Sequence, residues 1–249
     1  MSHSKWLYPF LILGLCPLGA SAEPQRALFS HENNFPRWEQ FEAGVEFNMA
    51  ELEASVGMVD VWDATPYIRY GLLDNLAARV DVPYRNVDPD FGDSESGLGD
   101  VEVELQLLAY EDIFGYPYYI PYVNVSLPTG DEDKGLGEDD VVVTPGMAYG
   151  GRIRDWIGWV IDVGYRINPD RDNQFLVSHS YLWDISEDFT LLTEVRYEEE
   201  SEGDEDSKFL LTGGFSYNWS RKLQMAVHAG SGISGETDVL GQVRFTYSF

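Results

Sequence analysis

The last twelve residues of the chain, Asp238 to Phe249, alternate between apolar and polar side chains. One parity holds Val239, Gly241, Val243, Phe245, Tyr247 and Phe249, and the other holds Asp238, Leu240, Gln242, Arg244, Thr246 and Ser248. Because side chains of a β-strand point alternately to opposite faces, this segment predicts a strand with one apolar and one polar face. Leu240 is the single apolar residue on the polar parity.

This segment resembles the closing strand of bacterial outer-membrane barrels, where a terminal Phe and alternating aromatic residues are read by the insertion machinery. We therefore expect Phe249 to contact that machinery. An edge strand of a soluble β-sandwich is the alternative that the segment alone leaves open.

The amino-terminal residues indicate secretion. Lys5 precedes an apolar run from Leu7 to Gly19, and Ala20-Ser21-Ala22 supplies the small residues that a signal peptidase requires. The run is too short for a spanning helix, so residues 1–22 predict a cleaved signal peptide. A lipoprotein site at Cys16 is disfavoured because Leu15 before it is large. Since Cys16 is the only cysteine, the mature chain can form no disulfide.

Composition agrees with a secreted all-β protein. Aromatic residues make up 14% of the chain and Gly numbers 24, while no mature segment has eighteen consecutive apolar residues. The formal net charge is −27, which repels nucleic acid, so no nucleic-acid partner is expected.

The same alternation recurs from about residue 39 to the end. It is clearest at Ile157, Trp159, Ile161, Val163, Tyr165 and Ile167. We predict about twelve strands of roughly 9–12 residues, the length that a tilted strand needs to cross a bilayer. Residues 23–38 show neither strand nor helix periodicity and predict a periplasmic lead-in, while residues 51–58 predict a loop.

The connections alternate in kind along the chain. Those after odd-numbered strands are acidic, rich in Gly and often long, and those after even-numbered strands are shorter. An outer-membrane barrel has this asymmetry, with short turns in the periplasm and longer loops outside. The predicted fold is therefore an all-β, antiparallel, up-and-down meander β-barrel over residues 39–249, in the outer membrane of a Gram-negative bacterium.

In such a barrel the apolar parity faces lipid and the polar parity faces the lumen. Eleven charged residues on the polar parity are candidate lumen-lining residues: Arg69, Arg79, Asp81, Arg85, Glu102, Glu104, Asp162, Arg166, Glu194, Arg196 and Arg244. They predict either a charged constriction that screens solutes or a cross-strand ion-pair network that fills the interior.

No enzyme, cofactor or metal site is expected. A lipid hydrolase would need a Ser and a His within reach of each other. His179 lies on the lipid parity, and His228 has no Ser within two residues. The acidic loop from Asp131 to Asp140 does not match an EF-hand. We expect it to contact lipopolysaccharide through solvated divalent cations rather than to hold a dedicated metal.

Three short motifs carry a family resemblance. They are Tyr70-Gly71-Leu72-Leu73-Asp74-Asn75-Leu76 running to Val82-Pro83-Tyr84, Ser96-Gly97-Leu98-Gly99-Asp100, and Leu127-Pro128-Thr129-Gly130-Asp131 followed by Gly135-Leu136-Gly137. Together they resemble the outer-membrane transporter family labelled as the meta-pathway of phenol degradation. The resemblance implies an outer-membrane barrel and a conduit for aromatic or other apolar small molecules.

The sequence therefore predicts a porin-like passive channel for small molecules, surrounded by outer-membrane lipid and lipopolysaccharide. Two alternatives stay open. One is a non-conducting structural or adhesion barrel with acidic outer loops, and the other, less favoured, is an outer-membrane lipid hydrolase.

Overall fold

The structure is a computed structural model that describes residues 24–54, 57–169, 171–200, 207–234 and 237–249. The predicted signal peptide at residues 1–22 lies outside these ranges. Within them, no helix is both long enough and apolar enough to cross a membrane. The regular helix seen there is one short 3-10 turn, η1 (Glu132–Lys134).

All strands belong to a single antiparallel sheet. Their bounds are β1 (Phe41–Ala54), β2 (Gly57–Leu73), β3 (Leu76–Asp81), β4 (Tyr84–Pro89), β5 (Glu95–Leu98), β6 (Val101–Leu107), β7 (Tyr110–Glu111), β8 (Tyr118–Leu127), β9 (Val142–Arg154), β10 (Ile157–Arg166), β11 (Gln174–Asp184), β12 (Phe189–Glu200), β13 (Lys208–Asn218), β14 (Leu223–Ser234) and β15 (Thr237–Ser248).

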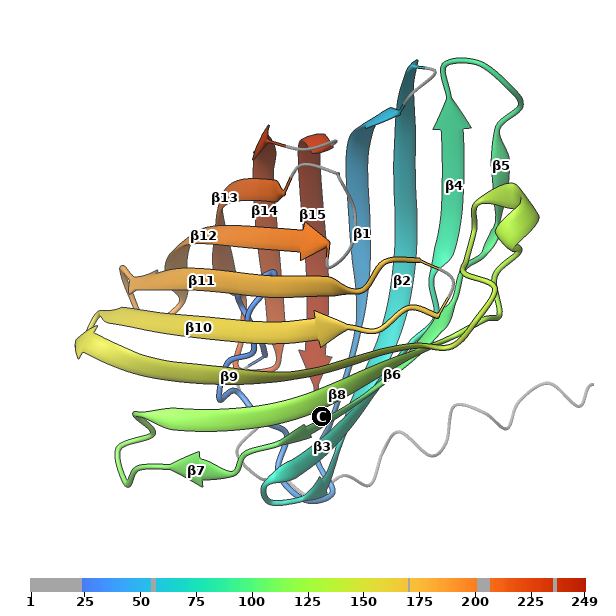
Figure 1. Cartoon of the computed structure of the whole chain (residues 1–249). Helices are drawn as coiled ribbons and strands as arrows, with labels where there is room; N and C mark the ends of the chain where they lie inside the picture. The colour runs from blue at the N-terminus through green and yellow to red at the C-terminus, as the bar shows by residue number, and fades with distance from the viewer. Residues whose placement is uncertain (1–23, 55–56, 170, 201–206, 235–236) are drawn as a thin grey trace, which may run out of the picture.

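The sheet closes on itself, because β1 pairs with β2 on one side and with β15 on the other. β3 and β4 both pair with β2 and together make one barrel strand, interrupted near Pro83, which has no backbone N–H to donate. β5, β6 and β7 follow one another along the next barrel strand. Counted in this way the barrel has twelve strands, which confirms the predicted antiparallel meander (Figure 1).

The two faces of the sheet differ as the alternation predicted. Outward side chains such as Ile68 and Leu211 are 57% and 46% exposed, whereas inward ones such as Glu104 and Thr212 are buried. Only closed barrels and helices satisfy every backbone hydrogen bond in lipid. A closed barrel with an apolar exterior is therefore an outer-membrane architecture, and the soluble sandwich is excluded.

Two segments differ from the sequence-based expectation. The first is residues 51–58, predicted as a loop, where β1 instead continues to Ala54 and β2 begins at Gly57. Figure 1 shows the far ends of β1, β2 and β4 standing highest in the view. Side chains there still alternate, but with the polar side outward.

The second difference is the amino-terminal segment. Residues 24–37 are irregular, as predicted, yet they lie inside the barrel rather than outside it in the periplasm (Figure 1). Ala27 and Ser30 are fully buried there. The physical reason is that the charged inner wall supplies hydrogen-bond partners for this polar stretch. A prediction from the alternation of apolar and polar residues carries no information about such partners. We call residues 24–37 the plug.

Candidate functional site: a plugged lumen

The plug is folded around one carboxylate. Glu32 Oε1 accepts the backbone N–H groups of Arg26 and Ala27 at 2.6 and 2.8 Å, and Glu32 Oε2 pairs with the Arg26 guanidinium at 2.8 Å. Charge-assisted hydrogen bonds of this kind are about twice as strong as neutral ones. Glu32 therefore gives a short irregular segment a defined shape.

A second carboxylate, Glu194 on β12, fastens the plug to the wall. It accepts the backbone N–H groups of Leu28 and Phe29 at 2.7 and 3.3 Å, and the hydroxyl of Ser180 at 2.6 Å. Ser30 of the plug lies 2.6 Å from the same Ser180 hydroxyl. A buried carboxylate is stabilised by such donors, so Glu194 and the plug depend on each other.

His31 joins the plug to two further strands of the wall. Its ring nitrogens lie 2.6 Å from Asp162 on β10 and 3.0 Å from Glu104 on β6, and its ring packs against Tyr122 with the centroids 3.9 Å apart and the planes tilted by 32°. Burial lowers the pKa of His31, but the two carboxylates outweigh it and raise the pKa to about 10. His31 is therefore a cation at neutral pH.

Two wall arginines complete the attachment by donating to plug carbonyls. Arg69 on β2 donates to Asn34 at 2.7 Å, and Arg244 on β15 donates to Arg26 and Ala27 at 3.1 and 3.0 Å. At the end with short turns, Arg26 also pairs with Asp184 at 3.0 Å. The plug is thus attached inside the end of the barrel that carries the short turns.

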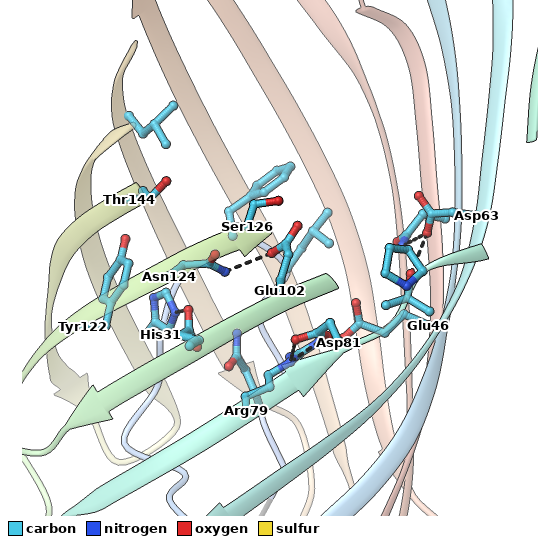
Figure 2. Close-up of a pocket in the computed structure, with 18 of the residues that line it drawn as sticks. His31, Glu46, Asp63, Arg79, Asp81, Glu102, Tyr122, Asn124, Ser126 and Thr144 are labelled. Atoms are coloured by element: carbon cyan, nitrogen blue, oxygen red, sulfur yellow. Dashed lines mark hydrogen bonds and ion pairs between the residues drawn. The ribbon is translucent and has the colours of Figure 1, made fainter. Parts of the chain in front are cut away.

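Beyond the plug, toward the long loops, the lumen is a cavity of about 410 Å³. Figure 2 shows Tyr122, His31 and Thr144 on one side of it and Glu46 and Asp63 on the other. Leu28 and Phe29 of the plug are also among the lining residues, together with the inward-facing Leu176. The cavity therefore combines charged and apolar walls, which the alternation alone did not predict.

The structure brings all eleven predicted lumen residues to the barrel interior. Eight line the cavity: Arg79, Asp81, Arg85, Glu102, Glu104, Arg166, Arg196 and Arg244. The other three, Arg69, Asp162 and Glu194, are buried and bond to the plug.

Most of the cavity arginines belong to ion pairs. Arg79 contacts Glu46 at 2.8 Å and Asp81 at 2.6 Å, Arg196 contacts Glu198 at 2.5 Å, and Arg166 contacts Glu138 at 3.3 Å; Arg244 reaches Glu46 at 3.5 Å. Glu46 joins β1 to β3 and β15 through Arg79 and Arg244, whereas Arg79–Asp81 and Arg196–Glu198 are contacts within one strand, so only part of the arrangement is a cross-strand network. Arg85 differs, because no ion pair joins it to any residue that the structure describes.

Sequence reasoning missed the plug residues, above all His31 and Phe29, and the wall carboxylate Glu46. Glu46 shares the polar parity of β1 with Glu42, which was a usable signal. The plug offered no such signal, since the partners of His31, Glu104 and Asp162, lie 73 and 131 residues away in the chain.

The hydrolase alternative lacks the required geometry. His228 Nε2 lies 3.0 Å from the Arg26 carbonyl, and Ser180 donates to Glu194 instead of to a histidine. His179 faces outward beside Tyr181 on the same strand, at 4.6 Å between ring centroids. Neither histidine therefore activates a serine as a nucleophile requires.

Two of the three family motifs, at residues 96–100 and 127–137, meet at the loop after β8. Asp100 is buried and accepts the backbone N–H groups of Thr129, Gly130 and Glu138 at 3.0, 2.8 and 2.8 Å. The carboxylate thus holds both ends of the acidic loop. Nowhere in the described ranges do three or more His, Cys, Asp or Glu side chains form a potential metal site.

Comparisons with known proteins agree with this architecture. A family model described as "Putative MetA-pathway of phenol degradation" matches residues 39–248, whereas no curated protein matches the chain. An outer membrane channel from Pseudomonas putida F1 superposes with a TM-score of 0.69 at 14% identity, covering 94% of this chain and 100% of that one.

Two further solved structures share the fold. The KdgM porin superposes with a TM-score of 0.59 at 10% identity, covering 83% of this chain and 99% of that one. The CymD monoaromatic hydrocarbon channel superposes with a TM-score of 0.50 at 10% identity, covering 85% and 89%. These structures are described as a porin and a channel, and each shares the barrel fold with this chain. The family match spans most of the sequence, so this chain, an outer-membrane β-barrel, belongs to the family described as the putative MetA-pathway of phenol degradation.

Proposed function

We propose that the barrel is a passive channel for small molecules of apolar or aromatic character. The observation that carries this proposal is that a non-covalently held plug, and no part of the sheet, occupies the lumen next to the cavity. Hydrogen bonds and ion pairs attach the plug, and such contacts can exchange without breaking the barrel. Movement of the plug would join the cavity to the periplasm.

The lining of the cavity supports the kind of solute. Five residues bring apolar surface into a lumen whose other lining residues are polar or charged: Leu28, Phe29, Pro83, Val142 and Leu176. A solute with an apolar body would remove that surface from water, which is favourable at about 25 cal/mol per Å². The related CymD barrel is described as a monoaromatic hydrocarbon channel, which favours the same solute class.

Planar-bilayer conductance and solute flux into liposomes test this function. Glu32→Gln removes the charge that organises the plug, so we expect conductance and benzyl alcohol flux above those of the unmodified protein. Glu187→Gln, in an exposed turn, is the matched control and should change neither. The absence of current and flux from both the unmodified protein and Glu32→Gln, with the barrel folded, would contradict the channel.

The tight attachment of the plug favours one rival, a non-conducting structural or adhesion barrel. On that reading the acidic loop after β12 would act at the cell surface. Deleting residues 198–206, which lie partly outside the described ranges, would then change surface binding and leave permeability unaltered. Lipopolysaccharide and the insertion machinery that reads Phe249 are the partners expected under either function.

A further inference from the structure

At the end of the barrel that carries the long loops, β1, β2, β4 and β15 form a wall in which apolar side chains face inward and carboxylates face outward. Their inward side chains are apolar, and the register places them side by side: Ala50, Leu52, Val59, Val61, Val87 and Leu240. Their outward neighbours include Glu51, Asp60 and Asp88, which are adjacent across the three strands. We call the six apolar residues the mouth patch.

This inversion indicates that the wall stands beyond the lipid. Three carboxylates in a row would be costly against hydrocarbon, so their outward face lies in water. The mouth patch therefore faces the opening of the lumen, and its side chains remain only partly buried. Apolar surface that no strand of the barrel covers marks a place where a ligand can bind.

Arg85 lies directly below the mouth patch. It shares the inward face of β4 with Val87, two residues away, and its register partner on β2 is Asp63, next to the Val61–Val87 pair. Two residues along a strand span about 6.6 Å, so the guanidinium and the first valine lie within reach of one small molecule.

Arg85 also differs from the other cavity arginines in its bonding, because within the described ranges it is the one that forms no ion pair. Its Nε is buried without a hydrogen-bond partner, as are those of Arg69 and Arg244. A buried donor left without a partner costs free energy. An incoming anion would remove that cost.

We propose that the mouth patch and Arg85 form an entry site for a small amphipathic carboxylate. The carboxylate accepts hydrogen bonds from Arg85, and the apolar or aromatic body lies on Val87, Val61 and Val59. The site names a narrower solute class for the channel proposed above, and its purpose rests on that function.

The nearby acids favour the amphipathic ligand over a simple anion. Asp63 accepts hydrogen bonds from Asn48 and Thr65, and Glu102 accepts one from Asn124. Within the described ranges neither carboxylate forms an ion pair with Arg85. Their charges still repel an anion, as do those on the outward face of the wall. An inorganic anion has no apolar body to offset this repulsion, whereas an aromatic carboxylate does.

Fluorine-NMR titration of the detergent-solubilised full barrel tests binding without relying on flux. The probes are 4-fluorobenzoate, 4-fluorobenzyl alcohol and fluoroacetate, with empty micelles as the blank. We expect 4-fluorobenzoate to bind at least about tenfold more tightly than either of the others, since it alone uses both halves of the site.

Variants then assign the two halves. Arg85→Gln should weaken 4-fluorobenzoate binding about tenfold or more, Arg85→Lys should weaken it less, and Val61→Asn should weaken it while leaving fluoroacetate unchanged. Arg154→Gln, at the opposite end of the barrel, is the matched control, and heat-modifiable gel mobility checks folding.

The outcomes separate the two proposals. Equal affinity for 4-fluorobenzoate and 4-fluorobenzyl alcohol, or unchanged binding in folded Arg85→Gln, overturns the entry site even if the barrel conducts. Binding that depends on Arg85 in a barrel that passes neither current nor solute supports the site and contradicts the channel.

Discussion

Inward-facing tyrosines lie flat against the barrel wall because a glycine stands opposite each one. The pairs in register are Tyr67 with Gly44, Tyr118 with Gly150, and Tyr122 with Gly146. A Cβ at Gly146 would overlap the Tyr122 ring, so only glycine permits this packing. The flat ring lets the Tyr122 hydroxyl reach Asp162 at 2.7 Å, next to His31. Sequence alone could not predict these pairs, because they depend on the register of two strands.

Gly146→Ala is therefore expected to push the Tyr122 ring into the lumen and to weaken the contact with Asp162. Overpacking of this kind typically costs about 1–3 kcal/mol. We expect a lower unfolding temperature, measured by heat-modifiable gel mobility. Gly213→Ala on the outward face, where the nearest atom lies 3.9 Å from the added Cβ, is the control and should unfold like the parent.

The raised pKa of His31 gives the plug a pH dependence. In the unfolded chain the pKa is about 6.5, and in the folded barrel it is about 10. The stability that the charged contacts with Asp162 and Glu104 contribute is therefore fully present below about pH 6.5 and is lost as pH rises through about 10.

We expect bilayer conductance to increase between pH 8 and pH 11 as His31 loses its proton and the plug loosens. His31→Gln should conduct more at neutral pH and show a smaller rise over that range. Parallel pH profiles for the two proteins would contradict this role of His31.

At the scale of elements, the alternation of apolar and polar residues predicted the barrel strands well, because each residue of a membrane-spanning strand faces either lipid or the lumen. It failed in two places where that rule does not hold. The far ends of β1 and β2 stand outside lipid, so Leu52 and Val59 face inward and the strand was taken for a loop. The plug has no period, since single contacts such as Leu28 with Glu194 position it.

The loop after β8 is an element whose order depends on one residue. Asp100→Ala removes the acceptor of three backbone N–H groups, and each buried donor left unpaired costs about 1–3 kcal/mol. We expect the loop to open and trypsin to cleave after Lys134 faster than in the parent. Asp133→Ala, an exposed substitution in the same loop, should leave the cleavage rate unchanged. Equal cleavage rates in the two variants would contradict the role of Asp100 in holding the loop.

At the scale of the whole molecule, charge is distributed unevenly between the cavity and the rest of the protein. The chain carries a formal charge of −27, yet the cavity lining holds five arginines, Arg79, Arg85, Arg166, Arg196 and Arg244, against five carboxylates, Glu46, Asp63, Asp81, Glu102 and Glu104. The excess negative charge therefore lies outside the cavity, where salt screens it. We therefore expect the acidic exterior to select solutes by the sign of their charge, and the lumen to select them by shape and hydrogen bonding.

Reversal potentials in a KCl gradient measure this division, with Glu32→Gln used to raise the current. We expect a preference for K⁺ over Cl⁻ at low salt, because the acidic exterior concentrates cations at the mouth. The preference should fall toward 1 M salt, where the screening length shrinks from about 10 Å to about 3 Å. A preference that does not depend on salt would locate the selective charges inside the cavity instead. In that case the outer carboxylates would have no part in steering solutes, and an amphipathic carboxylate would meet no barrier before Arg85.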